Sequence, residues 1–423
     1  MPSGEGAQAG LNRASGPMPI LIALAAGLAL GLVGMGRSWA GQGLAIAEPV
    51  GGMWLDGLKM TIVPLVVSLL ITGIIKAAAA ARAGRLALRS VITFLVLLWA
   101  SSLMAALVMP LLFNLWPLSA EAAQALQTSG APSGPLGAAP GVGDFLRSFI
   151  PSNLIAAAAS DAILPLTVFT IIFAFALLSL EAEKRDLLAK LFEALGDAML
   201  VVIGWVLRLA PIGVFALAFS VAAKAGISAL GALAHYVVLV SATGGVVLLA
   251  AYGVAMVGGR IGLGQFARAV LPAQAVAVST QSSLASLPAM LGSCAALGIP
   301  AARADLILPL AVALFRATGP AMNLAVALYI AHWTGAEPGW MQIAAAIAVA
   351  ATTTLGAVSL PGQLSFVSSI APIALVLGVP VEPLGLLIAV ETLPDIMRTL
   401  ANVTMDVAVT ATISRQTEGD DAA

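Results

Sequence analysis

A stripe of charged and polar side chains near the carboxyl end of the chain is the feature most able to do chemistry. It lies within 383–413, an otherwise apolar segment predicted to form one helix, and comprises Glu391, Asp395, Arg398, Thr399, Asn402 and Asp406. At about 100° per residue these side chains fall within an arc of roughly 100°, so we predict that they share one face. Ionisable groups in an apolar setting must be satisfied by a cavity, an ion or one another.

The residue types in this stripe suit a small acidic solute that carries an amino group. The guanidinium of Arg398 can bind a carboxylate with two parallel hydrogen bonds, and Asp395 can pair with an ammonium. Thr399 and Asn402 can add hydrogen bonds, while Asn402 and Asp406 are hard oxygen donors for sodium, or Asp406 a proton carrier. A structural alternative is that Asp395 and Arg398, at i and i+3, neutralise each other.

The composition places this stripe in a membrane protein. Of 423 residues, 60% are hydrophobic and 9% charged, whereas soluble domains are about 45–50% apolar and about 25% charged. The net charge of −1 excludes a basic surface for nucleic acid. The single cysteine, Cys294, permits no intrachain disulfide, and His235 and His332 have no metal-ligand spacing. No catalytic motif occurs, so we expect a non-enzyme without a resident cofactor or certain metal site.

Six long apolar segments precede the stripe, each long enough to cross about 30 Å of hydrocarbon as a helix. They are 18–36, 49–75, 88–113, 162–181, 192–220 and 229–257. The first has only Arg13 before it, which favours a retained helix over a signal peptide. Residues 1–17 and 414–423, rich in Gly, Ser, Ala, Asp and Glu, are predicted to be disordered tails.

Basic residues gather in alternate loops, which predicts the orientation of the chain. The loop after the second segment is strongly basic, whereas the loop after the third holds only Arg147. The basic loop residues are Lys76, Arg82, Arg85 and Arg89, then Lys184, Arg185 and Lys190, then Arg260 and Arg268, with Arg415 near the end. We therefore expect a multi-pass protein of the cell (inner or plasma) membrane with both termini cytoplasmic.

Two short apolar segments after residue 262 are interrupted by polar tips at 279–288 and 352–362. Irregular backbone at membrane depth is tolerated only where protein or a water-filled cavity supplies hydrogen-bond partners. Two interruptions in corresponding positions predict re-entrant hairpins of an inverted-repeat transporter with its site near the midplane. The alternative is that both tips are ordinary turns outside the membrane.

Taken together, these motifs resemble the dicarboxylate/amino acid:cation symporter family, the glutamate transporter homologues. The stripe matches the family's final-helix pattern, and the polar tips match its two hairpins. Further matches lie at 59–66, 151–153 and 210–217, so the resemblance covers nearly the whole chain.

The resemblance implies an all-α polytopic membrane protein with eight transmembrane helices, two re-entrant helical hairpins and elevator-type movement. Residues 18–257 would supply six spans, mainly scaffold and trimerisation contacts with the third span joining the transport domain, and 258–413 the transport core. It further implies a homotrimer in the lipid bilayer that carries aspartate, glutamate or C4-type dicarboxylates with Na⁺ or H⁺ as coupling ion. An uncoupled channel or solute sensor is the alternative, and a structural protein without a ligand is a third.

The same resemblance assigns roles residue by residue. Arg398 would hold the distal carboxylate and Asp395 the amino group, which favours amino acids because dicarboxylate-specific members tend to lack that Asp. The substrate-binding set is completed by Ser282, Ser283, Gly362, Thr399 and Asn402, and the cation ligands would be Ser101, Ser102, Asn402 and Asp406.

The predicted seventh span departs from the sodium-coupled pattern. Members that use sodium carry Asn-Met-Asp-Gly-Thr there, and an ungapped alignment places Phe-Arg-Ala-Thr-Gly of 315–319 on it. Arg316 thus stands midway along an apolar helix, a costly position. We predict that its guanidinium replaces a sodium ion and neutralises Asp406, with protons carried through Glu391. The alternative is that Arg316 only pairs with Asp406 or Asp395 to settle the fold.

Overall fold

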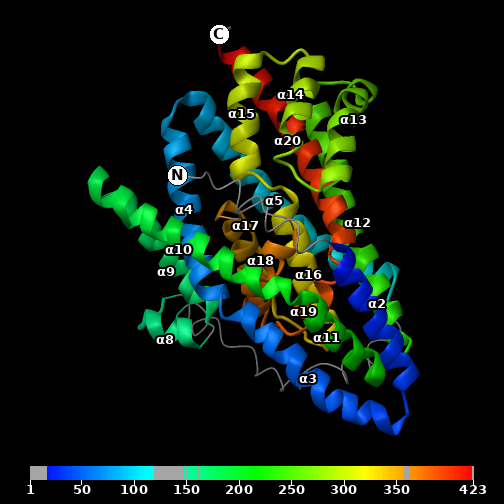
Figure 1. Ribbon diagram of the computed structural model, residues 1–423. Coiled ribbons are helices and arrows are strands. Elements are labelled where there is room, and N and C mark those ends of the chain that lie inside the picture. The colour runs from blue at the N-terminus through cyan, green and yellow to red at the C-terminus, as the bar shows by residue number, and fades with distance from the viewer. Residues whose placement is uncertain (1–16, 119–146, 148–149, 161, 357–361, 422–423) are drawn as a thin grey trace, which may run out of the picture.

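The computed structural model describes residues 17–118, 147, 150–160, 162–356 and 362–421, and these contain helices and no strand (Figure 1). The predicted all-α class is therefore confirmed for the described residues. Of the predicted tail 1–17, only residue 17 is described, as the first residue of a helix.

The helices follow one another through short connections. The first half contains α2 (Pro17–Gly34), α3 (Ser38–Lys59), α4 (Ile62–Arg82), α5 (Arg85–Leu115), α8 (Leu154–Ala159), α9 (Ile163–Leu178), α10 (Ala182–Arg208), α11 (Ala210–Ala225) and α12 (Ser228–Val257). The second contains α13 (Leu263–Thr280), α14 (Leu287–Ala296), α15 (Ala301–Leu314), α16 (Thr318–Thr334), α17 (Trp340–Thr353), η1 (Thr354–Gly356), α18 (Gly362–Leu377), α19 (Pro383–Leu387) and α20 (Thr392–Asp421).

Four helical stretches are long and apolar enough to cross a membrane within the described part of the chain. They are Ser38–Arg82, Arg85–Leu115, Leu230–Val257 and Ala301–Thr334. A fifth results if α10 and α11, bent by 58° relative to each other, form one span. Shorter apolar helices include most of α2, α9 and both hairpin regions. The chain is thus a multi-pass membrane protein by its helices, and the total of eight spans stays a prediction.

Small residues allow α2 to pack closely along α11. A Cβ added at Gly27 would lie 2.5 Å from the carbonyl oxygen of Phe215, and one at Gly31 would lie 2.6 Å from that of Phe219. Any larger side chain at either glycine would push the helices apart. These two helices and α3 lie together at the end of the molecule opposite the carboxyl terminus (Figure 1).

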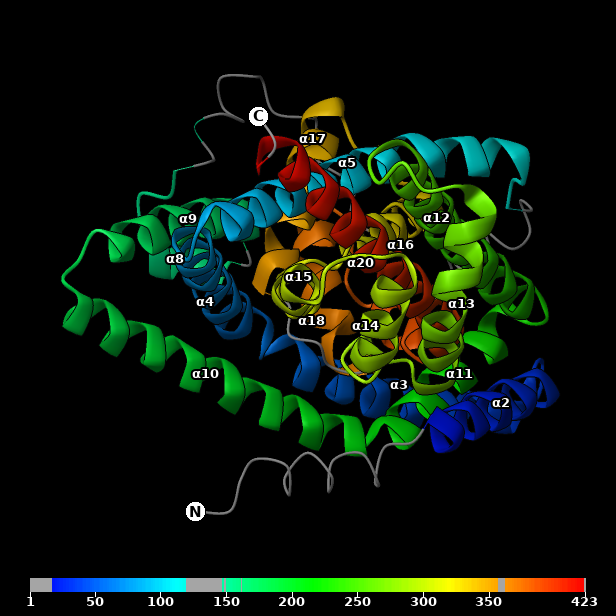
Figure 2. The ribbon, with the colours of Figure 1, turned by 90° about the horizontal axis from the view of Figure 1, so that it is seen from above.

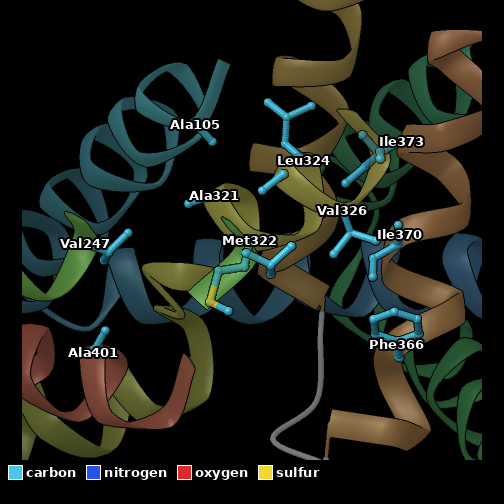
Figure 3. Packing of buried hydrophobic residues seen from close by; sticks show 14 of the residues in the cluster. Ala105, Val247, Ala321, Met322, Leu324, Val326, Phe366, Ile370, Ile373 and Ala401 are labelled. Carbon is cyan, nitrogen blue, oxygen red and sulfur yellow. The ribbon is translucent and has the colours of Figure 1, made fainter. Parts of the chain in front are cut away.

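The core is built around α16, whose side chains are buried along nearly its whole length. Helices α5, α12, α17, α18 and α20 pack on it. Figure 3 shows Leu324 and Val326 of α16 on the side of Ile373 and Ile370 of α18, whereas Met322 points to the opposite side, toward α12 and α20. Because α16 is apolar all round, it must be enclosed by other helices.

Four predicted helices are interrupted in the structure. The segment 49–75 divides between α3 and α4, and 192–220 divides between α10 and α11, whereas the other two interruptions lie near the polar stripe. Arg316 does not lie within a helix, because α15 ends at Leu314 and α16 begins at Thr318. The predicted helix 383–413 is likewise divided, with turns at 388–391 that place Glu391 between α19 and α20. The segments around the interruptions near Arg316 and Glu391 are predominantly apolar, which is why hydropathy alone did not predict them.

The carboxyl end also differs from expectation. We predicted a disordered tail from residue 414, but α20 continues through 414–421. Arg303 of α15 donates to the Ser414 carbonyl oxygen at 2.6 Å, and Arg89 of α5 donates to the Gln416 carbonyl oxygen at 3.5 Å. Cationic donors at helix carbonyls are favourable, so two distant helices support this end of α20.

Candidate functional site

The interruptions at Arg316 and Glu391 bring the predicted polar stripe together with residues of α12 and α16. Helix α20 contacts α12, α13, α14, α15 and α16, and it runs through the middle of the molecule when seen from above (Figure 2). Asp395, Thr399, Asn402 and Asp406 are all buried. The predicted single face is therefore an interior face.

Arg398 is the centre of this face, and each of its three nitrogens has a partner. Nη2 donates to Oε1 of Glu391 at 2.9 Å, and Nη1 donates to Oδ1 of Asn323 at 2.9 Å. Nε lies 3.5 Å from Oδ1 of Asp395. The structural alternative of an Asp395–Arg398 pair is thus present, but the closer carboxylate is that of Glu391.

Each carboxylate oxygen of Glu391 has a hydrogen-bond partner. Its exposed fraction is 1%, and its second oxygen, Oε2, accepts a hydrogen bond from the Tyr236 hydroxyl at 3.1 Å. Tyr236 is itself fully buried on α12 and contacts the ring of Tyr329 edge to face. A buried carboxylate needs such partners, because an isolated one is costly.

Asn402 joins α20 to the break between α15 and α16. Its Oδ1 accepts hydrogen bonds from both the backbone N–H and the hydroxyl of Thr318, each at 2.9 Å. The Thr318 hydroxyl also lies 3.3 Å from the Arg398 carbonyl oxygen. The amide oxygen expected to serve a substrate or cation is therefore engaged by the start of α16.

Asp406 lies further along α20 without a hydrogen-bond partner for either carboxylate oxygen among the described residues. Its exposed fraction is 1%. Arg316, in the break, acts electrostatically on Asp406 and on Asp395. The structure thus brings Arg316 and Asp406 into one polar region.

The two serines of the third predicted span have different environments. Ser101 of α5 donates to the carbonyl oxygen of Ala317, so it reaches the break beside Arg316. Ser102 donates at 3.0 Å to the carbonyl oxygen of Ile347 in α17. Of the two predicted cation ligands, Ser101 contacts the break and Ser102 contacts the second hairpin region.

The predicted first hairpin corresponds to α13 and α14, both of which contact α20. Its tip contains Ser282 and Ser283, both partly buried, and the Ser282 hydroxyl accepts a hydrogen bond from the Ala285 backbone N–H at 3.2 Å. Gly362 begins α18 of the second hairpin. Of the predicted tip 352–362, residues 352–356 form the end of α17 and η1, and residues 357–361 lie outside the described residues.

Three contributors to this site were not predicted. Tyr236, Asn323 and Thr318 come from α12 and α16, which are apolar helices without a polar periodicity. An isolated polar residue within an apolar span is the available signal, and it identifies Asn323 as unusual. Nothing in the sequence shows that Tyr236 meets Glu391, which is 155 positions away.

Known proteins resemble this chain over most of its length. Residues 18–416 match the family model described as the sodium:dicarboxylate symporter family. The chain is 28% identical to the proton/glutamate-aspartate symporter of Escherichia coli (strain K12), covering 91% of this chain and 89% of that protein.

Two further relatives differ in the solutes and ions in their names. The C4-dicarboxylate transport protein of Anaeromyxobacter sp. (strain K) is 28% identical, covering 88% of this chain and 84% of that protein. The proton/sodium-glutamate symport protein of Bacillus subtilis (strain 168) is 26% identical, with coverages of 93% and 91%.

Proposed function

This chain belongs to the sodium:dicarboxylate symporter family, and from that premise we propose that it is a cation-coupled secondary transporter of aspartate, glutamate or C4-type dicarboxylates. The observation that carries the proposal is the guanidinium of Arg398, whose side chain is 11% exposed and lies among carboxylates on an interior face of an apolar helical protein. Such a group suits a small dianion, because arginine matches the geometry of a carboxylate.

In this proposal Arg398 binds the distal carboxylate and Asp395 the amino group when one is present. Thr399, Asn402 and the first-hairpin serines Ser282 and Ser283 complete the substrate contacts, together with the second hairpin at Gly362. The relatives' names include both amino acid and C4-dicarboxylate carriers, so both classes are candidates. All the named relatives are symport or transport proteins, which favours coupled transport over the channel or sensor alternative.

The wider architecture belongs to the same proposal. We place the protein in the cell membrane as a homotrimer with both termini cytoplasmic, a scaffold formed mainly by 18–257 and a transport core in 258–413 that moves as an elevator. Support comes from the basic loops, the family and the two hairpin regions.

Uptake into proteoliposomes tests the function. Labelled aspartate, glutamate, succinate and malate are offered separately, with a gradient of sodium, of potassium or of protons alone. We expect at least one of these solutes to accumulate above its external concentration when the correct cation gradient is imposed. Saturable binding without accumulation would favour a sensor, and equilibration without coupling would favour a channel.

We also propose that Arg316 takes the place of a sodium ion. It lies in the break that Ser101 and Asn402 contact through Ala317 and Thr318, and it acts electrostatically on Asp406. A fixed positive charge there would make an added cation unfavourable, because like charges in a low-dielectric site repel strongly. Transport would then be independent of sodium.

Two measurements test the role of Arg316. Replacing external sodium with choline should leave wild-type uptake unchanged. Arg316→Met combined with Ala317→Asp removes the resident cation, adds a carboxylate and should create sodium dependence, whereas Arg316→Met alone serves as the matched control. Strong sodium stimulation of the wild-type protein would refute this assignment.

A further inference from the structure

Glu391 is hydrogen-bonded to the nitrogen of Arg398 that a substrate carboxylate requires for two parallel hydrogen bonds. A guanidinium binds a carboxylate bidentately along one of two edges, Nε with Nη2 or Nη1 with Nη2, and both edges include Nη2. In the structure Nη2 donates to Glu391, while the outer nitrogens face Asp395 and Asn323. A substrate carboxylate must therefore displace a present partner of Arg398.

Of the three partners, Glu391 is the charged group that forms the closest contact with Arg398. Asn323 is neutral, and the Nε–Oδ1 separation from Asp395 is 3.5 Å, compared with 2.9 Å for the contact with Glu391. Once moved from Arg398, Glu391 keeps only the Tyr236 hydroxyl among its hydrogen-bond partners in the described residues. A buried carboxylate that loses its counter-charge is strongly unfavourable unless it takes up a proton.

The charges that surround Glu391 also favour its protonation when substrate binds. Glu391 is faced by Arg398 and Asp395 from α20 and by Tyr236 from α12. Helix α18, which also packs on α19, has no ionisable side chain in its sequence. The polar region as a whole contains two cations and three carboxylates among the described residues. Arg398 and Arg316 interact electrostatically with the carboxylates of Glu391, Asp395 and Asp406. An acidic substrate adds net negative charge to this region, which a proton on Glu391 would partly offset.

We propose that Glu391 is the proton carrier of this transporter, released from Arg398 by the substrate carboxylate and protonated as it is released. This inference rests on the function proposed above. The proton comes from water on the side of substrate entry and binds a carboxylate oxygen of Glu391, while the Tyr236 hydroxyl turns from donor to acceptor. When the substrate leaves, Glu391 gives the proton to water on the other side and binds Arg398 again, which resets the empty site.

The test compares wild-type protein with Glu391→Gln in proteoliposomes, using labelled L-aspartate and labelled succinate. In wild-type vesicles an inward proton gradient should drive accumulation, and adding substrate should acidify the lumen, read with an enclosed pH-sensitive dye. Glu391→Gln should lower proton-driven accumulation by at least about tenfold and abolish lumen acidification. Exchange of internal against external substrate should persist, since it needs no net proton movement.

Binding gives a second readout that a merely structural role would not change. In the wild-type protein substrate affinity should weaken as pH rises, because each bound substrate requires a proton; in Glu391→Gln it should be independent of pH. Glu193→Gln is the matched control, since that carboxylate lies at the surface with Lys76. The same loss in Glu193→Gln would overturn the assignment.

Tyr236→Phe provides a variant that keeps the buried ring and removes only the hydroxyl. In the wild-type protein the hydrogen bond from this hydroxyl favours the charged form of Glu391. In Tyr236→Phe the pH dependence of substrate binding should therefore move to higher pH while the protein remains folded. An unshifted profile would count against the role of this contact.

Two outcomes separate the inference from the proposed function. If the wild-type protein carries no acidic solute under any gradient, the proposed function itself fails. If it accumulates an acidic solute but protons do not drive it, or if Glu391→Gln retains proton-driven accumulation, only the role of Glu391 fails.

Discussion

The α2–α11 contact and the α16–α20 contact hold helices together by opposite means. Along α2, Gly27 and Gly31 let the α11 backbone approach so closely that an added Cβ would meet carbonyl oxygens at 2.5 and 2.6 Å. Between α16 and α20, Thr318 and Asn323 form hydrogen bonds to Asn402 and Arg398. The small size of the glycines permits the first contact, whereas charge and hydrogen bonding stabilise the second.

This difference shows which part of the molecule can change partners. Close packing of small residues has one good arrangement, because any shift opens a void or produces a clash. A set of buried charges can exchange one partner for another of the same sign when a ligand supplies it. The polar α16–α20 contact is therefore suited to binding, and the α2–α11 contact to stability.

The largest effect is expected when the charge at the centre of the polar α16–α20 contact is removed. Arg398→Ala should abolish transport of every acidic substrate, because loss of a buried charged partner costs about 2–5 kcal/mol. Uptake measures the effect, and size-exclusion chromatography in detergent should show unchanged assembly. Unaltered apparent affinity for dicarboxylates would contradict the role of Arg398.

Asp395→Asn tests whether this side chain of the polar contact binds the amino group of a substrate. If Asp395 binds an ammonium, affinity for aspartate and glutamate should fall by roughly 1.5–3 kcal/mol, a range typical of hydrogen bonds to charged groups. Succinate and malate lack the amino group and should be much less affected. Competition binding with all four solutes measures this, and equal losses for both classes would favour a structural Asp395–Arg398 pair.

In the apolar contact, Gly31→Ala should destabilise the protein without changing substrate selectivity. The new Cβ would meet the Phe219 carbonyl oxygen and the Ala222 side chain, so we expect a loss of about 1–3 kcal/mol, as for other overpacked sites. Thermal unfolding in detergent measures it. Gly41→Ala in α3 is the control, because nothing lies within 4 Å of its added Cβ; equal destabilisation at both sites would argue against close packing as the cause.

The smallest effect is expected where a surface ion pair joins α3 to the segment before α19. Lys59 Nζ lies 2.5 Å from Glu382 Oε1, but the side chains are 31% and 37% exposed. Exposed pairs contribute about 0.2–1 kcal/mol. A double-mutant cycle with Lys59→Gln and Glu382→Gln should give a coupling energy in that range that decreases with salt. A coupling well above it would show that this pair contributes more than ordinary surface electrostatics.

Much of the fold could be predicted because membrane helices are encoded locally. Apolar segments predicted the positions of α5, α9 and α12 to within a few residues. The interruptions at Arg316 and Glu391 were missed because the segments around them are predominantly apolar. A backbone break there depends on partners from other helices, such as Asn402 binding Thr318.

The sequence by itself determined that this is an all-helical membrane protein with Asp395, Arg398, Asn402 and Asp406 on one interior face, because a helical repeat places residues three or four apart together. Only the tertiary structure decided which groups meet that face. Glu391 lies between Arg398 and Tyr236, and Asn323 binds Arg398 from 75 positions away. No local repeat relates side chains on different helices, so these partners depend on how α12, α16 and α20 pack against one another.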